Sequence, residues 1–286
     1  MNNIFNIKRF GLVFRKDLME NMKRYVLLFL TMLGIITIVT IFMSWNYFHD
    51  FSGGNSSANL LYHNRQLLIL LSFAFLAGGL LFASTLMAPM NSKLKRLSYL
   101  SNPSSNLEKF LTRWIIVTIG YILAFFVAMW IADALRVAVI SAGYPDLEIK
   151  FLDLSKLYYP TDDYSSSYYM VPKFVFTIMI CIYFVLQSLF LLGATFWEKT
   201  SFIKSFVAIS ILIFSYITLC RWAILISYEE GLGDFGNVLN SFLGDKTDAK
   251  EQLLKMVAYT VLSVITLASW VLAFFRFRES EITKRL

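Results

Sequence analysis

Charged residues are scarce in this sequence, and their scarcity sets the class of protein. Asp, Glu, Lys and Arg make up 16% of the 286 residues, against 57% hydrophobic residues, and the mean hydropathy is +0.61. One soluble core cannot hide so much apolar surface, so the sequence predicts a membrane protein. The net charge of +7 does not indicate nucleic-acid binding, because no polar stretch is long enough to build a basic soluble domain.

Cysteine and histidine are almost absent. Cys181 and Cys220 fall in apolar runs, so we expect neither a disulfide framework nor a four-ligand metal site. His49 and His63 fall in the predicted first external loop without ligand spacing, and we expect both to be solvated loop residues. No G-x-x-x-x-G-K-[ST] phosphate loop occurs, so we expect no ATP hydrolysis, no enzymatic activity and no bound cofactor in this chain alone.

Long apolar runs are abundant. A helix that crosses the hydrocarbon core needs about 20 apolar residues, and continuous runs without alternation exclude the strands of a membrane barrel. The predicted fold is therefore all-α and polytopic, with six transmembrane helices at about residues 25–45, 67–87, 112–132, 172–195, 205–226 and 257–275.

The loops between these runs predict an orientation. If the N-terminus is cytoplasmic, most Lys and Arg residues lie in the inside segments, and most Asp and Glu residues lie outside. The positive-inside rule then places both termini in the cytoplasm, together with the loop between the second and third spans.

The first 24 residues form a separate predicted unit before the six-span domain at residues 25–286. Ile4, Ile7, Phe14 and Leu18 recur at helical spacing on one side, with basic residues on the others. This pattern is typical of an amphipathic helix that lies along the inner lipid headgroups. The alternative is a frayed basic tail.

The cytoplasmic loop carries the start of a helix in the string "PSSNLEKFLTRW", residues 103–114. Ser105 followed by Glu108 is a capping box, in which each side chain satisfies a backbone N–H group of the other residue. We consider two interpretations, a docking helix for a cytoplasmic partner and a lead-in turn that starts the third span. The docking residues would be Ser105, Leu107, Glu108, Lys109, Phe110, Leu111 and Arg113.

Two external segments have unusual compositions. Residues 141–171 are rich in tyrosine, which favours interface anchors, with a stacking surface for a ring-bearing substrate as the alternative. Residues 227–256 combine several glycines with a helical stretch at 248–255, which favours a broken or re-entrant element.

Few ionisable residues fall inside the spans. Asp133, Arg136 and Arg221 lie near the predicted outer helix ends, where Asp133 and Arg136 can pair at i,i+3. No carboxylate falls near a predicted midplane, which weakens the case for a proton-driven carrier.

Small residues predict close helix packing. They recur every four residues in the third span, and the second span has one pair with the same spacing. Rows of this kind serve contacts within one subunit or between subunits. These positions are Gly120, Ala124, Ala128 and Ala132, and then Gly79 and Ala83.

The whole chain resembles the permease subunit of bacterial ABC type-2 exporters. The resemblance lies in the layout, in the string "NPSSNLEKFLTRW" at residues 102–114 and in the ending "FFRFRESEI" at residues 274–282. It implies a bacterial inner-membrane protein in which two permease subunits, identical or different, pair around a translocation route formed by the first, second and fifth spans.

The resemblance also implies partners. Separate ATPase subunits, which bind ATP and magnesium, would dock on a cytoplasmic coupling helix containing Leu107, Glu108, Lys109 and Phe110, and residues 3–24 would move as a lever. The alternatives are a secondary carrier or channel, an integral-membrane enzyme acting on lipid, and a membrane scaffold of an envelope complex. No residue pattern identifies the cargo.

Overall fold

A computed structural model describes residues 5–50, 57–87, 104–145, 149–152, 173–197, 200–229 and 248–283, and in these ranges all regular secondary structure is helical, with no strand. The elements in chain order are α1 (Ile7–Asp50), α2 (Ser57–Ala83), α4 (Asn106–Ile115), the π-helix η2 (Ile116–Gly120), α5 (Tyr121–Gly143), α7 (Lys173–Phe196), α8 (Ser201–Glu229) and α10 (Asp248–Thr283).

Six of these helical runs are long and apolar enough to cross a membrane, which confirms the predicted all-α architecture. The third run is built from α4, η2 and α5, which follow one another without a break from Asn106 to Gly143. The chain is therefore a multi-pass membrane protein in which α4 begins the third span. This continuity favours the interpretation of the capped segment as a lead-in to that span.

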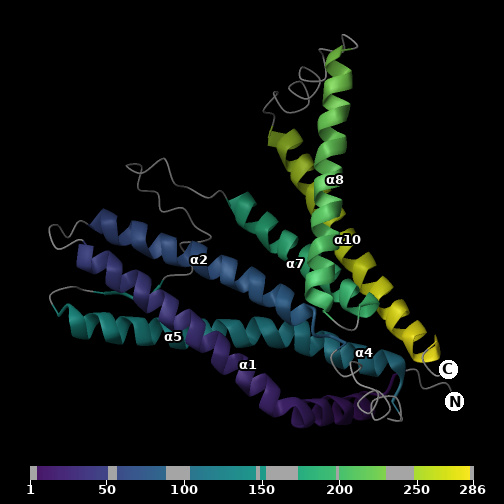
Figure 1. Ribbon diagram of the computed structural model, residues 1–286, viewed down its shortest axis with the longest axis horizontal. Coiled ribbons are helices and arrows are strands. Elements are labelled where there is room, and N and C mark those ends of the chain that lie inside the picture. Colours follow the sequence, from purple (N-terminus) through teal and green to yellow (C-terminus); the bar gives the residue numbers. More distant parts are fainter. Residues whose placement is uncertain are drawn as a thin grey trace.

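The helices form two groups that meet at one end of the molecule (Figure 1). In one group α5 packs along α1 and also contacts α2, and in the other α7 packs along α10 and contacts α8. The start of α1, all of α4 and the end of α10 lie at the end where the groups meet, whereas α8 splays away from α2 and α5 (Figure 1).

Helix α1 is longer than the predicted first span. The sequence predicts a separate interfacial helix that ends near Arg24, but residues 7–50 form one helix that bends after its N-terminal part (Figure 1). No glycine or proline lies near residue 24 to end a helix, so helical hydrogen bonding continues into the apolar run. Ile7 is 73% exposed and Leu18 is 37% exposed, while Val13 and Asp17 face the rest of the chain.

The small residues predicted at helix contacts pack mostly inside the chain. Ala128 and Ala132 are fully buried in a cluster with Ile36 of α1 and Leu71 of α2. Ala83 is fully buried in a second cluster that includes residues of α7 and α10. These three positions therefore serve contacts within one subunit. The other two positions of the row in the third span, Gly120 and Ala124, are only partly buried.

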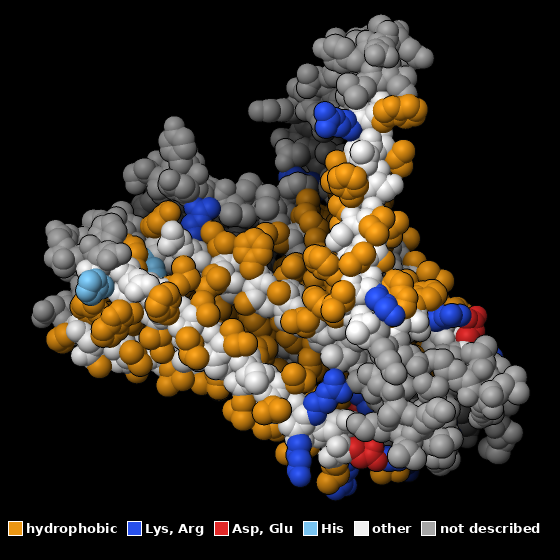
Figure 2. Space-filling view, viewed as in Figure 1, with side chains coloured by type: hydrophobic (Ala, Val, Ile, Leu, Met, Phe, Trp, Pro, Cys, Tyr) orange, Lys and Arg blue, Asp and Glu red, His pale blue; other side chains and the backbone are white. Residues whose placement is uncertain are grey.

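Hydrophobic side chains cover most of the helical surface in view (Figure 2). Helix α8 is the clearest case, because large apolar residues such as Leu212, Phe214 and Trp222 are all more than half exposed. Many of the lysine and arginine side chains in view gather near the N-terminal part of α1 (Figure 2). An extensive exposed apolar surface is typical of a helix bundle that lies in a bilayer.

At the opposite end of the third span, the predicted pair of Asp133 and Arg136 is confirmed. Their side chains are 2.7 Å apart, and both are buried. Arg136 also donates to the carbonyl of Lys150 at 3.1 Å, and the N–H of Leu152 donates to Asp133 at 2.8 Å. The pair therefore ties residues 149–152 back onto α5. Most of the tyrosine-rich segment and residues 230–247 of the glycine-rich segment lie outside the described residues.

Gly79 is the packing residue whose substitution tests this arrangement. A Cβ atom at Gly79 would lie 2.6 Å from the ring of Tyr183 and 3.1 Å from the ring of Tyr121. Gly79→Ala is therefore expected to destabilise the protein by about 1–3 kcal/mol, because α2 must move away from both rings. Thermal unfolding in detergent, followed by tryptophan fluorescence, measures the change.

Gly34→Ala in α1 is the matched control, since a Cβ at Gly34 meets nothing within 4 Å. It should leave the melting temperature unchanged or raise it slightly. Equal destabilisation by the two variants would contradict the close contact at Gly79.

Candidate functional site

The site begins with the cap of α4, where the predicted capping box is confirmed. Ser105 has an extended backbone (φ −70°, ψ 154°), and its hydroxyl accepts from the N–H of Glu108 at 3.2 Å. In return Glu108 Oε2 accepts from the N–H of Ser105 at 3.1 Å. A cap of this kind stabilises a helix by about 0.5–2 kcal/mol and fixes where it starts.

Glu108 also holds the start of α1. Its oxygens accept from the backbone N–H of Asn6 at 2.9 Å, from Arg9 Nε at 2.7 Å and from Arg9 Nη2 at 2.8 Å. The side chain of Glu108 has no exposed surface, whereas that of Arg9 is 35% exposed. Two charge-assisted bonds in a fork fix orientation as well as distance. One carboxylate thus caps α4 and binds an arginine that lies 99 positions earlier in the chain.

Asn6 completes this joint from the side of α1. Its side-chain oxygen accepts from the N–H of Lys8 at 3.0 Å, and its carbonyl accepts from the N–H of Phe10 at 2.8 Å. Asn6 therefore sits in the position of an N-cap of α1 while its own N–H donates to Glu108. The starts of two helices share one hydrogen-bonded centre.

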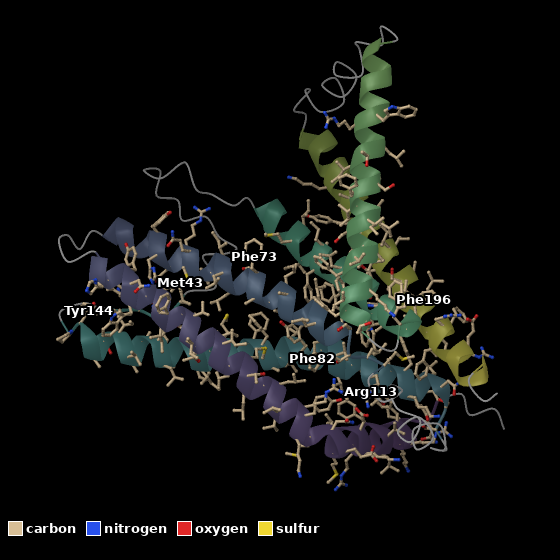
Figure 3. All side chains as sticks on the ribbon, in the orientation of Figure 1. Met43, Phe73, Phe82, Arg113, Tyr144 and Phe196 are labelled. Atoms are coloured by element: carbon tan, nitrogen blue, oxygen red, sulfur yellow. The ribbon has the colours of Figure 1, made fainter. Side chains whose placement is uncertain are left out.

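A second polar contact joins the two helices about two turns further along α1. Arg113 forms an ion pair with Asp17 and donates to the hydroxyl of Tyr25 at 3.3 Å. That hydroxyl donates to the other oxygen of Asp17 at 3.2 Å. Figure 3 shows Arg113 between α4 and the N-terminal part of α1. The side chains of Arg113 and Asp17 are 7% and 8% exposed, so the charges neutralise each other away from water.

The other side of α4 contacts the end of α10 through aromatic rings. Phe110 lies 5.5 Å from Phe274 and 5.8 Å from Phe277 between ring centroids. Trp114 lies 5.0 Å from Trp270 in an edge-to-face arrangement. Aromatic pairs in this geometry contribute about 0.5–1.5 kcal/mol beyond the area that they bury.

Helix α4 is thus held on two sides, by ionic contacts to α1 and by aromatic contacts to α10. We call α4 with its contact residues in α1 and α10 the α4 junction. The strings at residues 102–114 and 274–282 supply Phe110, Phe274 and Phe277, so they contact each other although they lie far apart in the sequence.

The residues predicted to dock a partner are placed as follows. Glu108, Lys109, Phe110 and Arg113 are buried, and Ser105, Leu107 and Leu111 are partly buried. In this conformation the carboxylate of Glu108 is therefore enclosed by the chain itself. Docking stays a prediction, and the basic residues Lys93, Lys95 and Arg96 of the same loop lie outside the described residues.

One prediction about histidine is wrong. His63 is not a solvated loop residue but lies in α2, is 1% exposed and shares a hydrogen bond of 3.0 Å with Ser44 of α1. Its ring stacks on Tyr47 with 4.3 Å between centroids. Helix α2 begins at Ser57, so the polar stretch before the apolar run continues the helix. His49 is exposed, but it lies in the last turn of α1 rather than in a loop. Within the described ranges no three His, Cys, Asp or Glu residues are grouped to hold a metal ion.

The contacts that sequence reasoning missed all span long stretches of chain. Nothing in local spacing pairs Arg9 with Glu108 or Asp17 with Arg113. The basic N-terminal segment contains two acidic residues, Asp17 and Glu20, and nothing in the sequence shows that Asp17 is the one with a buried partner.

A scan against protein-family models finds no match to this chain, and searches of curated proteins and of solved structures find none either.

The link between Glu108 and Arg9 can be separated from the helix cap by mutation. Glu108→Gln keeps a residue that completes a capping box but removes the charge, so α4 should stay capped while α1 is released. We expect Glu108→Gln and Arg9→Gln each to lower the melting temperature. The double variant should melt at a temperature no lower than that of the more damaging single variant. Thermal unfolding of the native protein, the two single variants and the double variant gives the coupling energy between the two positions.

Lys16→Gln is the control, because Lys16 and Glu20 form a solvent-exposed pair at 3.7 Å. Removing an exposed pair should change the melting temperature very little. If the effects at Glu108 and Arg9 simply add, the two side chains do not depend on each other, and the ionic joint is contradicted.

Proposed function

We propose that this chain is the membrane-spanning permease subunit of an ATP-driven exporter. In this proposal the chain pairs with a second permease subunit, of the same or a different kind, and separate ATPase subunits bind beneath it in the cytoplasm. The resemblance of residues 102–114 and 274–282 to ABC type-2 permeases supports the family. It also supports placement in a bacterial inner membrane with both termini in the cytoplasm.

The observation that carries the proposal is the double attachment of α4. A helix that receives a push from a soluble motor must be rigidly joined to the parts that move. Helix α4 meets this requirement, because Glu108 and Arg113 bind α1 while Phe110 and Trp114 pack on α10. It also continues directly into the third span through η2. A displacement of α4 would therefore reach both groups of helices.

The burial of Glu108 refines the role of the coupling residues. Because the carboxylate has no exposed surface, it acts from inside the chain by keeping α1 attached to α4. The motor subunit would press on the loop that leads into α4, and the α4 junction would pass the displacement on. Under this proposal residues 7–24 move together with α4 as a lever, since they are joined to it at two points.

Phe110 is the residue whose substitution tests transmission. Phe110→Ala removes the contacts of Phe110 with Phe274 and Phe277 in α10, and it leaves in place the contact of Trp114 with Trp270 and the ionic contacts with α1. We expect the variant to retain a bound ATPase and to lose the stimulation of ATP hydrolysis that the membrane subunit provides. The measurement compares hydrolysis by the complex purified from native membranes, reconstituted in lipid, with hydrolysis by the isolated ATPase.

Ile119→Ala serves as the matched control, because Ile119 lies in the third span with its side chain 44% exposed. It should leave stimulation intact. The proposal is wrong if no phosphate-loop ATPase accompanies the chain and the chain alone carries an ion-gradient-driven flux in liposomes, which would identify a secondary carrier.

A further inference from the structure

The N-terminal part of α1 turns one side away from the rest of the chain. Val13 and Asp17 point inward and are 9% and 7% exposed. On the opposite side, positions 8, 12, 15, 19 and 23 follow one another at helical spacing, so their side chains share a face. All of them are exposed, as are the adjacent positions 16 and 22. We call this set the outward face, and its members are Lys8, Leu12, Arg15, Lys16, Met19, Met22 and Lys23.

The outward face combines cations with large apolar side chains. Leu12, Met19 and Met22 are 68%, 65% and 62% exposed, and the other members are lysine or arginine. Water is a poor solvent for the apolar members, and hydrocarbon is a poor solvent for the charged ones. The boundary between lipid headgroups and acyl chains suits both kinds, because the apolar side chains can enter the acyl region while the cations stay among the headgroups.

The outward face has a strong excess of positive charge. The two acidic residues on this part of α1 are Asp17 and Glu20. Asp17 is buried against Arg113, and Glu20 forms only a solvent-exposed pair with Lys16 at 3.7 Å. An exposed pair of this kind is weak, so the face keeps its attraction for anions. Many of the lysine and arginine side chains in view lie in this region (Figure 2). A surface of this charge complements the phosphate groups of acidic lipids.

The contacts with α4 place the outward face at the edge of the membrane. Asp17 pairs with Arg113, which lies where the apolar part of the third span begins. Helix α1 itself continues without a break from these residues into its own apolar run. The N-terminal part of α1 therefore lies beside the point where two helices enter the hydrocarbon region. The bend in α1 turns this part out of the line of the first span (Figure 1).

This depth favours lipid over a soluble protein as the partner. An acidic protein surface would also attract the cations, but lipid headgroups are present at this level on all sides of a membrane protein. Lysine and methionine side chains are long and flexible, so they adapt to a fluid surface that has no fixed shape.

We infer that the outward face binds the headgroups of anionic phospholipids in the membrane that holds the chain. Leu12, Met19 and Met22 enter the acyl boundary, while the four cations contact phosphate groups. Because Arg9 and Asp17 join the same part of α1 to α4, the bound lipids also hold the α4 junction against the membrane. The inference does not depend on the transport function proposed above, since it concerns only the lipid beside α1.

The experiment measures which lipid lies beside position 19. The full chain, with the native cysteines replaced and Met19→Cys carrying a fluorophore, is placed in nanodiscs of phosphatidylcholine and phosphatidylglycerol in equal amounts. In each of two samples only one of the lipids has a nitroxide on its acyl chain near the headgroup, which quenches the fluorophore on contact. Phosphatidylglycerol should quench about fivefold more strongly than phosphatidylcholine, and the preference should weaken as salt is added.

A charge variant tests the role of the cations. It replaces the four lysine and arginine residues of the outward face with glutamine and leaves Arg9 and its bond to Glu108 intact. The preference for phosphatidylglycerol should then disappear. Lys204→Gln combined with Arg278→Gln is the matched control, because it removes exposed cations from α8 and α10 and should leave the preference at position 19 unchanged.

Two kinds of result would overturn the inference. Equal quenching by the two lipids, or a preference that persists in the charge variant, would show that the cations do not select anionic headgroups. No quenching by either lipid would show that the face lies in water or against a protein. A fluorophore at Leu212→Cys is the reference for that result, since Leu212 is 68% exposed on the apolar surface of α8 and should be quenched by both lipids.

Discussion

The carboxylate of Glu108 is the contact on which the end of the molecule depends. It accepts hydrogen bonds from the backbone of Ser105 and Asn6 and from the guanidinium of Arg9, with no surface left for solvent. Two helix starts and one ion pair thus share a single group. Because a buried carboxylate is stable only when its oxygens are satisfied, each of these partners is needed to keep the others in place.

The buried polar groups described in this chain change from charged to neutral and back to charged along the membrane-spanning helices. Charged contacts gather at the end that holds α4 and the start of α1, where the pair of Asp17 and Arg113 follows the pair of Arg9 and Glu108. The opposite end has the buried pair of Asp133 and Arg136. Between them the buried side chains of Thr118, Tyr121, Tyr183 and Gln187 contain only hydroxyl and amide groups. Neutral groups are the polar groups that an apolar core tolerates at the lowest cost, so this order follows from desolvation.

The sequence correctly predicted the structural features that depend on residues close to one another in the chain. The six helices follow from apolar runs, and the cap of α4 follows from the spacing of Ser105 and Glu108, which the structure confirms. The pairing of Asp133 with Arg136 was predictable for the same reason, since both lie on one helix face. Each of these features depends on residues within a few positions of one another.

The joints between distant segments were not predictable. Arg9 and Glu108 are 99 positions apart, and only the packing of α1 on α4 brings them together. The error at His63 has a related cause, because its polar neighbours look like a loop until α2 is seen to begin at Ser57. The boundary predicted near Arg24 is not a helix end, since no helix breaker lies there and α1 continues. Tertiary packing thus sets the joint between Arg9 and Glu108, whereas the other two differences come from helices that extend beyond their apolar runs.

A distance measurement between α1 and α10 tests the α4 junction most directly. Spin labels at the exposed positions Arg15 and Arg278, with the native cysteines replaced, report the separation of the two helices that α4 joins. A single narrow distance distribution in lipid is expected for the native junction, with broadening when Phe110→Ala weakens its contact with α10 or Glu108→Gln weakens its contact with α1. A distribution that is equally broad in all three proteins would show that α4 does not hold the two helix groups together.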